Sequence, residues 1–562
     1  MNANKHCLSG IIVGLMLASC GTAFGGKVVE IGGEGGLTPA QTVAAAEALK
    51  DGETLSIKKG VYTLGTNGAK RVFLAPSNNV TGDKDILFPL FGKKNVTVDG
   101  NGSTLIISGD AFPFAVLKSE GVTIKNLTIR AKYSPSFSMS MKENRADGVL
   151  LKIGEGNVPY EVKDGHLVIK AEKGDISSRS NVISLHAIDR WGVHYLLTPE
   201  SAPTHDKDKT PAPFCTVVFE DKGNGEVFAR YLKDDHKFAA KVPFEAGRQL
   251  GSGLAGRVHE AIFFEDCAKS GAENIRIETW GGMGIVSQRS TDMTLRGYKV
   301  LPGKGDVCTT SADMMQFIAC GGLVTIENCE GRDSLDDVID IHGNYLGLER
   351  WDGTNYVLRA MHGDHFGFFP LRPGDTMSCL VPLDQRKVLG EFVVESWKPD
   401  PADPLHLAIV KPKADGRAAD AWPRPDGKLE TLVENVTLQP DVIFRNNKFT
   451  HYPHLRFSGR GKYLIENNRL ENAMAAMLIL DHPGYWYECG PVKDMTVRNN
   501  TFIGCNDQSG SAFITIGAFG DGSPSPKIHS GILLENNTYE RVKHSKVIAW
   551  AVAGLDNRDE KK

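Results

Sequence analysis

A short recurring motif constrains the fold of this chain more than any other feature of its sequence. Near the C-terminal end, runs of alternating apolar residues end in paired asparagines, and a bulky residue follows two positions later. The first members of the pairs are Asn446, Asn467, Asn499 and Asn536, at intervals of 21, 32 and 37 residues. A constant signature at variable spacing indicates a solenoid whose loops differ in length. We therefore predict an all-β chain with a right-handed parallel β-helix, in which asparagines stack at one corner, rather than unrelated Asn-Asn turns.

The motif also occurs earlier in the chain, and two long segments interrupt it. Similar short strands run from Asn95 to Ile107 and from Gly121 to Ile129. The interrupting segments carry hairpin-like strands with Pro/Gly turns, which predicts two small inserted antiparallel, barrel-like β domains. The expected organisation is a signal peptide at 1–25, an N-terminal cap with the first coils at 26–133, a first insert at 134–254, central coils at 255–349, a second insert at 350–438 and C-terminal coils at 439–562.

The N-terminus has the pattern of an export signal. Lys5 precedes a mostly apolar run from Leu8 to Ala18, which is too short to span a bilayer as a mature helix. The run ends in Leu-Ala-Ser-Cys, which resembles a bacterial lipobox with Cys20 as the lipidated residue. The small residues that follow equally allow ordinary cleavage. We expect an exported protein, periplasmic, at the cell surface or secreted, with an outer-membrane anchor at Cys20 as one of two alternatives.

The charge balance argues against nucleic acid as a partner. The chain has 64 Lys and Arg against 68 Asp and Glu, a formal net charge of -4, and it has no long basic run. A protein that follows a phosphate backbone usually carries a basic excess or stripe.

The cysteines do not form a metal-binding pattern. Outside the signal there is no CxxC pair and no Cys/His cluster with zinc spacing. Two alternatives remain in an exported protein: a disulfide that involves Cys308, Cys320 or Cys329, or buried thiols that pack as small apolar groups.

The stretch from Gly331 to Gly343, GRDSLDDVIDIHG, holds four aspartates and a histidine. Adjacent carboxylates repel and each needs hydration or a partner, so folding alone does not account for this density. Asp313 precedes Asp337 by 24 residues (337 minus 313), a plausible coil length. Because stacked parallel strands lie about 4.8 Å apart, we expect Asp313 next to Asp337, with Asp336 beside both. Like charges at this range drive pKa values apart, as a general acid and a general base require.

Residues around the acids are candidates for substrate binding. On the strand after the acid pair, alternate isoleucines should face inward and leave Asp340 and His342 outward. One coil earlier, Trp280 could stack on a sugar and Arg289 could offset negative charge, although either could be structural. The acid cluster could instead bind calcium or be a solvated surface, yet we predict no metal and no organic cofactor. Later residues that could line the same groove are His451, His454, Arg456, Asp481, His482 and Trp486.

An exported β-helix with two inserts, the Asp336-Asp337 pair in SLDDVIDIHG and an aspartate 23 residues earlier (336 minus 313) together resemble glycoside hydrolase family 110. The resemblance covers essentially the whole mature chain. It implies a bacterial exo-acting α-1,3-galactosidase on terminal α-linked galactose, in blood-group B-like, linear α-galactosyl or mucin glycans. It also implies inversion, in which one of Asp313, Asp336 and Asp337 protonates the leaving oxygen while another activates water about 6.5 to 9.5 Å away. The division favoured from the sequence gives water activation to Asp336 and Asp337, with Asp313 as the acid or as their partner.

Other functions stay open beside this one. The three aspartates also resemble those of polygalacturonases, but the two inserted segments of this chain are not those of polygalacturonases. A lyase on an acidic polysaccharide would need a Lys or Arg base beside the acids. A non-catalytic β-helix surface protein would bind a glycan and leave it intact. Self-association into a homo-oligomer is also open.

Overall fold

The computed structural model describes residues 26–134, 136–154, 157–171, 174–177, 183–187, 194–198, 214–232, 246–253, 257, 259–381, 387–413, 431–505, 512–518 and 527–559. The expected signal and the lipidation candidate Cys20 lie outside these ranges. Within them, no helix is both long enough and apolar enough to cross a bilayer.

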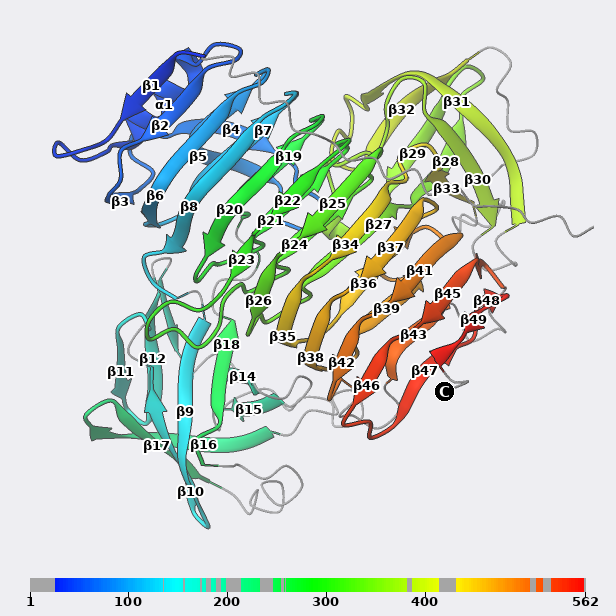
Figure 1. Cartoon of the computed structure of the whole chain (residues 1–562). Helices are drawn as coiled ribbons and strands as arrows, with labels where there is room; N and C mark the ends of the chain where they lie inside the picture. The colour runs from blue at the N-terminus through cyan, green and yellow to red at the C-terminus, as the bar shows by residue number, and fades with distance from the viewer. Residues whose placement is uncertain are drawn as a thin grey trace, which may run out of the picture.

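The body of the molecule is a parallel β-helix, whose stacked coils Figure 1 shows in chain order from blue to red. One long sheet contains β1 (Val28–Ile31), β2 (Thr54–Ile57), β3 (Val61–Leu64), β6 (Thr97–Ile107), β8 (Thr123–Ala131), β20 (Gly271–Ile277), β22 (Thr294–Arg296), β23 (Lys299–Val300), β25 (Leu323–Glu327), β26 (Glu330–Arg332), β34 (Asp441–Arg445), β35 (Lys448–Tyr452), β37 (Lys462–Glu466), β38 (Arg469–Ala473), β41 (Asp494–Arg498), β42 (Thr501–Ile503), β45 (Ile532–Glu535), β46 (Thr538–Glu540) and β49 (Asp556–Asn557).

A second long sheet forms another face of the same coils and carries the acid-rich stretch. It contains β4 (Lys70–Leu74), β5 (Gly82–Phe91), β7 (Ala111–Leu117), β19 (Ile262–Glu265), β21 (Ile285–Gln288), β24 (Met315–Ile318), β27 (Ile339–Asn344), β36 (Leu455–Phe457), β39 (Met477–Asp481), β43 (Ala512–Ala518) and β47 (Ser545–Ala549), and β40 (Glu488–Cys489) pairs with the end of β27.

Alternating apolar residues from both sheets fill the interior of the coils. On β27, Ile339 and Ile341 are fully buried in the main core, as the alternation predicts, while Asp340 and His342 point to the other side of the sheet. Helix α1 (Pro39–Ala48) begins with a capping box at Thr38 and packs near the first coils. The resulting core is continuous along the solenoid axis.

The two asparagines of each pair have different roles at the corner. The first residue of each pair, such as Asn467, has a positive φ of 57° and makes the turn. The second residue forms the ladder: Asn468 Oδ1 accepts from Asn447 N, and Asn500 Oδ1 accepts from Asn468 N, each at 3.0 Å. Asn537 continues the series, and Asp559 takes its place at the last coil. The expected asparagine stacking is therefore confirmed.

Two closed barrels interrupt the coils, so the predicted fold class is confirmed. The first consists of β9 (Ser136–Arg145), β10 (Gly148–Ile153), β14 (Ile183–Ala187), β15 (His194–Thr198), β16 (Phe214–Gly223), β17 (Glu226–Tyr231) and β18 (Gln249–Gly253), with a small sheet of β11 (Tyr160–Lys163), β12 (His166–Ala171) and β13 (Gly174–Ser177) beside it. The second consists of β28 (Leu346–Trp351), β29 (Tyr356–Ala360), β30 (Thr376–Val381), β31 (Lys387–Pro399), β32 (Leu407–Pro412) and β33 (Leu432–Asn435).

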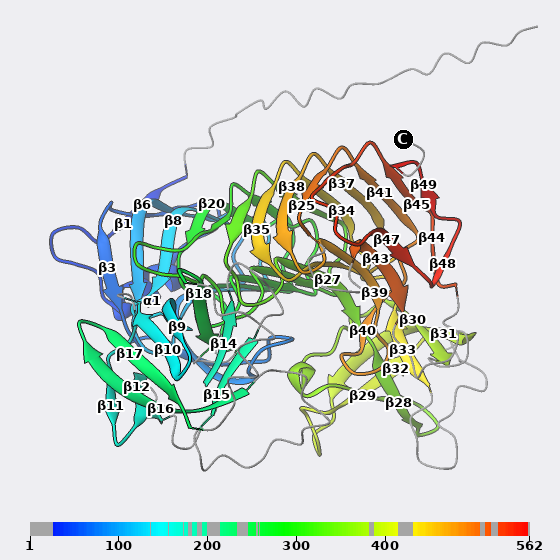
Figure 2. The same cartoon turned by 90° about the horizontal axis from the view of Figure 1, so that it is seen from below.

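Both barrels project from the same side of the β-helix, as Figure 2 shows, with β27 between them in that view. The second barrel begins at Leu346, earlier than the expected boundary at 350, because β28 follows β27 after a single residue.

The structure describes the side chains of seven cysteines, and none of these seven is in a disulfide. All seven are buried thiols, including Cys308, Cys320 and Cys329. Of the two alternatives for these three residues, the structure has the buried thiols.

Candidate active site

The acid cluster lies at the start of two adjacent strands of the second long sheet. Met315 of β24 pairs with Ile339 of β27, and this register carries back two residues to Asp313 and Asp337. The backbone confirms the neighbourhood, since Met314 N donates to Asp337 O at 2.9 Å. The coil repeat thus brings together the two aspartates that the sequence predicts as neighbours.

Asp313 and Asp337 are both buried, with 4% and 7% of their surface exposed. Burial, followed by the charge of Asp336, raises the pKa of each carboxyl well above its usual range. Arg257 opposes the shift at Asp313, and Arg456 opposes it at Asp337, without reversing either. Burial thus favours the protonated form of both carboxyls.

Asp336 lies in different surroundings from its two neighbours. Its side chain is 32% exposed, and its Oδ2 accepts a hydrogen bond from Arg257 Nη2 at 2.9 Å. Arg257 also donates to the backbone oxygen of Asn78 at 3.1 Å. Burial lowers the pKa of Arg257, but Asp336 and Asp313 raise it above its usual value, so Arg257 stays positive. The cluster therefore combines two buried acids with one paired and accessible carboxylate.

Asp340, on β27, belongs to a buried ion network beside the acids. Arg456 places Nη1 3.2 Å from Asp340 Oδ2 and Nη2 2.5 Å from Glu488 Oε2. Burial raises the pKa of Asp340 to about 6 although Arg456 opposes it. At Glu488 burial alone would raise the pKa, but the charge of Arg456, followed by that of His342, outweighs burial and lowers the pKa to about 2.

A cation could use oxygen and nitrogen atoms of this network. The ligand atoms of Asp340, His342 and Glu488 lie within 4.8 Å of one another. However, the guanidinium of Arg456 already contacts both carboxylates. A divalent cation would have to displace or repel this charge, so these residues do not fit a resident metal.

One histidine contacts an acid of the cluster, and a second lies beside the buried ion network. His454 Nδ1 lies 3.0 Å from Asp337 Oδ1, and burial followed by Arg456 lowers the pKa of His454 to about 3. His342 Nδ1 lies 2.9 Å from the oxygen of Gly343, and its Nε2 lies 3.4 Å from Gln316 Nε2 and 3.9 Å from Glu488 Oε1.

Trp280 and Arg289, predicted as substrate-binding residues, do not face the acids. Trp280 is 3% exposed within the main core, and its indole N–H donates to His259 O at 2.9 Å, which leaves no ring face for a sugar. Arg289 follows β21, at the opposite end of the strands from Asp313, and pairs with Glu265 and Asp266. Both assignments are corrected to structural roles. Coil alignment does not predict that the side chain of Trp280 turns into the core, nor the end of the strand at which Arg289 lies.

The remaining residues of the site were either not predicted or were predicted only as members of a larger set of groove-lining candidates. His454 and Arg456 are on the next coil, where Arg456 pairs in register with Asp340, so alignment across the second insert could have found them. Asn78, Arg257 and Glu488 come from connecting segments that have no repeat, and no sequence signal identifies them.

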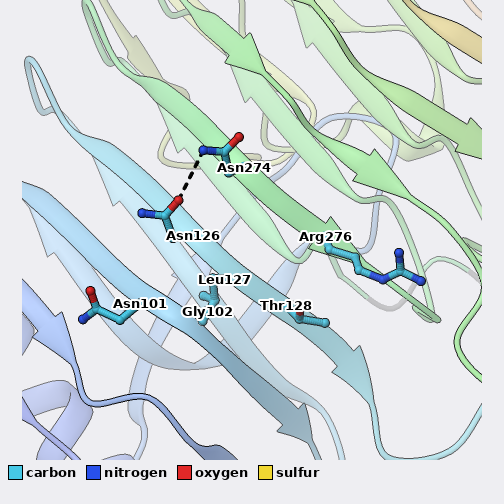
Figure 3. A pocket seen from close by; sticks show the side chains of 7 residues that line it. All are labelled: Asn101, Gly102, Asn126, Leu127, Thr128, Asn274 and Arg276. Carbon is cyan, nitrogen blue, oxygen red and sulfur yellow. Dashed lines mark hydrogen bonds between the residues drawn. The ribbon is translucent and has the colours of Figure 1, made fainter.

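A hollow of about 380 Å³ lies elsewhere, on the outer face of β6, β8 and β20. Figure 3 shows its lining, in which Asn274 donates to Asn126 at 3.2 Å. None of the acids of the cluster lines it. It is a shallow corner of stacked asparagines rather than a part of the candidate site.

Comparison with known proteins gives relatives along nearly the whole chain. Alpha-1,3-galactosidase A of Bacteroides fragilis is 28% identical over 537 residues, which cover 90% of this chain and 80% of the relative. Alpha-1,3-galactosidase B of Bacteroides thetaiotaomicron is 26% identical over 518 residues, covering 90% and 79%. The alpha-1,3-galactosidase A of Shewanella woodyi is 24% identical, covering 88% and 78%. No protein-family profile matches the chain.

Solved structures give weaker similarities. An alginate lyase from Paenibacillus has a TM-score of 0.34 at 8% identity, and the match covers 94% of this chain and 99% of the lyase. The polygalacturonase of Erwinia carotovora has a TM-score of 0.35 at 8% identity, covering 93% and 96%. Scores this low add nothing to the sheet topology. The sequence relatives, in contrast, confirm the expected resemblance of this chain to the bacterial α-1,3-galactosidases of glycoside hydrolase family 110.

Proposed function

We propose that this protein is an exo-acting glycosidase that removes terminal α-1,3-linked galactose from glycans, with inversion at the anomeric carbon. The observation that carries the proposal is the cluster of Asp313, Asp336 and Asp337 on adjacent coils, in a chain similar along 90% of its length to α-1,3-galactosidases. Two buried acids with raised pKa values and one ion-paired carboxylate supply a proton donor and a base to one bond.

Unpaired polar atoms near the cluster fit a ligand rich in hydroxyl groups. Asn78 Oδ1, Gln316 Oε1 and Asn344 Oδ1 are buried, and they have no hydrogen-bond partner within the described ranges. Gln316 lies beside His342, and Asn78 contacts both Arg257 and Glu488. Buried polar atoms are costly when unpaired, so hydroxyl groups of a sugar would be favourable partners for them.

The lyase alternative is disfavoured by the state of the arginines. Arg257 and Arg456 lie beside the acids, where a lyase needs its base. Burial lowers the pKa of each, but Asp336 at Arg257 and Asp340 at Arg456 raise it above the usual value. An arginine held protonated in this way is a poor base for removing a proton from a sugar carbon.

The decisive experiment is proton NMR of the enzyme with a panel of α-galactosides. We expect free galactose from α-1,3-linked substrates, and its first-formed anomer should be β. No galactose from any α-galactoside, with a folded protein, would exclude the glycosidase. Products with an unsaturated ring that absorb in the ultraviolet would establish the lyase, and unchanged but bound glycan would establish a surface binding protein.

Export, membrane anchoring at Cys20 and self-association also remain proposals. If Cys20 is lipidated, mass spectrometry of the mature N-terminus will find a diacylglyceryl-modified cysteine, and Cys20→Ser will move the protein from the membrane fraction to the soluble fraction. An unmodified N-terminus beyond Cys20 would establish ordinary cleavage instead.

A further inference from the structure

Three aromatic side chains form a cluster at the edge of the acid site; we call His362, Tyr485 and Trp486 the aromatic rim. The ring centroid of His362 lies 5.4 Å from that of Tyr485 and 4.8 Å from that of Trp486, and the centroids of Tyr485 and Trp486 lie 5.0 Å apart. Tyr485 and Trp486 come from the segment between β39 and β40, whereas His362 comes from the second barrel. Two parts of the chain thus meet in the rim.

Tyr485 is unusual because it is fixed but not covered. It is 69% exposed, among the highest values for large apolar side chains in the described part of the chain. An ordered aromatic ring left in water gains little from burial, and exposed apolar surface of this kind often marks a binding site.

The backbone beside the rim is held in place on both sides. His365 Nε2 lies 3.0 Å from the oxygen of Trp486, and its Nδ1 lies 2.8 Å from Ser77 Oγ. Burial and the nearby His342 lower the pKa of His365 to about 3, so the ring is neutral; it donates to Trp486 and accepts from Ser77. At the other end, His482 N donates to Glu488 O at 2.9 Å. The exposure of Tyr485 is therefore a feature of an anchored segment.

The rim adjoins the acids through one residue. The guanidinium carbon of Arg257 lies 5.9 Å from the ring of Trp486, while its Nη2 lies 2.9 Å from Asp336. Glu488, two residues after Trp486, contacts Arg456 in the buried network. The path from Asp313 and Asp337 through Asp336 to Tyr485 runs from buried to exposed, with 4% and 7% exposure at its inner end and 69% at its outer end.

We propose that the aromatic rim binds the sugar that carries the terminal galactose. This inference rests on the proposed function, in which the terminal galactose occupies the buried acids and the next sugar must lie outward. A pyranose has a face of C–H groups that packs on an aromatic ring, and its hydroxyl groups remain free for water. Tyr485 offers such a face, with the N–H and O–H edges of the rim beside it. The ligand class is a neutral pyranose linked through the oxygen that the acid protonates.

The test compares Tyr485→Ala on two substrates. One is the disaccharide galactosyl-α-1,3-galactose, and the other is α-galactosyl fluoride, whose leaving group is a single atom that cannot reach the rim. We expect kcat/KM on the disaccharide to fall about tenfold, mostly through KM, while kcat/KM on the fluoride changes less than about threefold. Tyr485→Phe, which keeps the ring, should restore the disaccharide activity.

Trp550→Ala serves as a matched control, because Trp550 is another exposed aromatic residue, at 42%, on the last coils. It should change neither activity. Equal losses on both substrates would overturn the proposal, since Tyr485 would then support the acids, and an unchanged disaccharide activity would overturn it as well. Failure of the unmodified protein on both substrates would instead exclude the proposed function, and the rim proposal with it.

Discussion

Asp313, Asp336 and Asp337 have the same side chain but three different surroundings. Arg257 opposes the rise in the pKa of Asp313, Asp337 forms a hydrogen bond with His454, and Asp336 is partly exposed and paired with Arg257. An enzyme that donates a proton to the leaving oxygen and takes one from water needs such differences, because the surroundings of each carboxyl decide which one acts as the acid and which as the base.

Replacing each of the three by Asn should lower kcat on a galactoside by about 10² to 10⁴, because proton transfer to or from the reacting bond is lost. Activity on α-galactosyl fluoride distinguishes the acid from the base, because fluoride leaves without protonation by a strong acid. The variant that lacks the acid should retain far more activity on the fluoride than on a disaccharide, whereas the variant that lacks the base should lose both. Galactose release under initial-rate conditions measures each case.

Asp333→Asn is the matched control, because Asp333 lies in the same acid-rich stretch but pairs with Arg332 and His451. It should leave kcat within a few-fold of the unmodified protein. A control variant as inactive as the other three would contradict the assignment of catalysis to Asp313, Asp336 and Asp337.

Glu260 predicts a pH-dependent stability. It is fully buried, and burial raises its pKa from 4.5 to about 7, although Lys84 and Asn79 oppose the shift. The folded state therefore keeps a proton between pH 4.5 and about 7 that the unfolded state releases, so this residue lowers stability as the pH rises through that window. Glu260→Gln should match the unmodified protein at pH 4 and be more stable by up to about 3 kcal/mol at pH 8. Thermal midpoints at both pH values measure this, and a variant that is less stable at pH 8 would refute it.

The pairing of Arg456 with Asp340 and Glu488 predicts that activity does not depend on a bound cation. Dialysis against a chelator should leave kcat and the thermal midpoint unchanged. Loss of activity that calcium restores would show that the cluster holds a metal after all.

At the scale of the coil, we expect the second asparagine of each pair to contribute more to stability than the first. Asn500 is 1% exposed, donates to Ile465 O at 2.9 Å and accepts from Asn468 N at 3.0 Å. Asn500→Ala leaves a buried carbonyl and a buried N–H without these partners and should lower the free energy of unfolding by about 2 to 4 kcal/mol. Urea unfolding followed by circular dichroism measures the change.

The neighbouring Asn499 provides the comparison. Its φ is 55°, which glycine adopts without strain, so Asn499→Gly should cost less than about 1 kcal/mol. Equal costs for the two variants would mean that the turn conformation, and not the hydrogen-bond ladder, stabilises the corner.

The elements that repeat could be predicted from the sequence, and those that do not repeat could not. The coil period placed Asp313 beside Asp337, because stacking converts a spacing along the chain into a distance. The same alignment failed for Trp280, since register does not say whether a residue near a corner turns into the core. Arg257 comes from a connecting segment and Glu488 from the short strand β40, and neither belongs to the coil repeat, so their positions depend on the whole fold.

At the scale of the whole molecule, the site is completed by contacts between the second barrel and the first coils. Asn78 N donates to the oxygen of Asp364 at 2.8 Å, and Thr81 Oγ1 donates to the oxygen of Phe366 at 2.7 Å. Asn78 in turn contacts Glu488 through Nδ2 at 3.2 Å. The barrel therefore fixes a segment of the first coils that reaches the acid site, although the segment is far from it in sequence.

Two glycines of the second barrel allow this connection to be tested. Gly367 has a φ of 89°, and a Cβ added there would lie 2.8 Å from the Cβ of Ala75 in the first coils. Gly374 has a φ of 93° and no atom within 4 Å of an added Cβ. Both Ala variants strain the backbone alike, but only Gly367→Ala pushes the barrel away from the segment that contains Asn78. We expect Gly367→Ala to lower kcat/KM about 10- to 100-fold, because shifts of about 1 Å at a catalytic site have effects of this size, while Gly374→Ala stays within about threefold. Steady-state kinetics, measured together with thermal midpoints, distinguish a displaced active site from a loss of folded protein. Equal kcat/KM values for the two variants would show that docking of the barrel does not set the geometry of the acids.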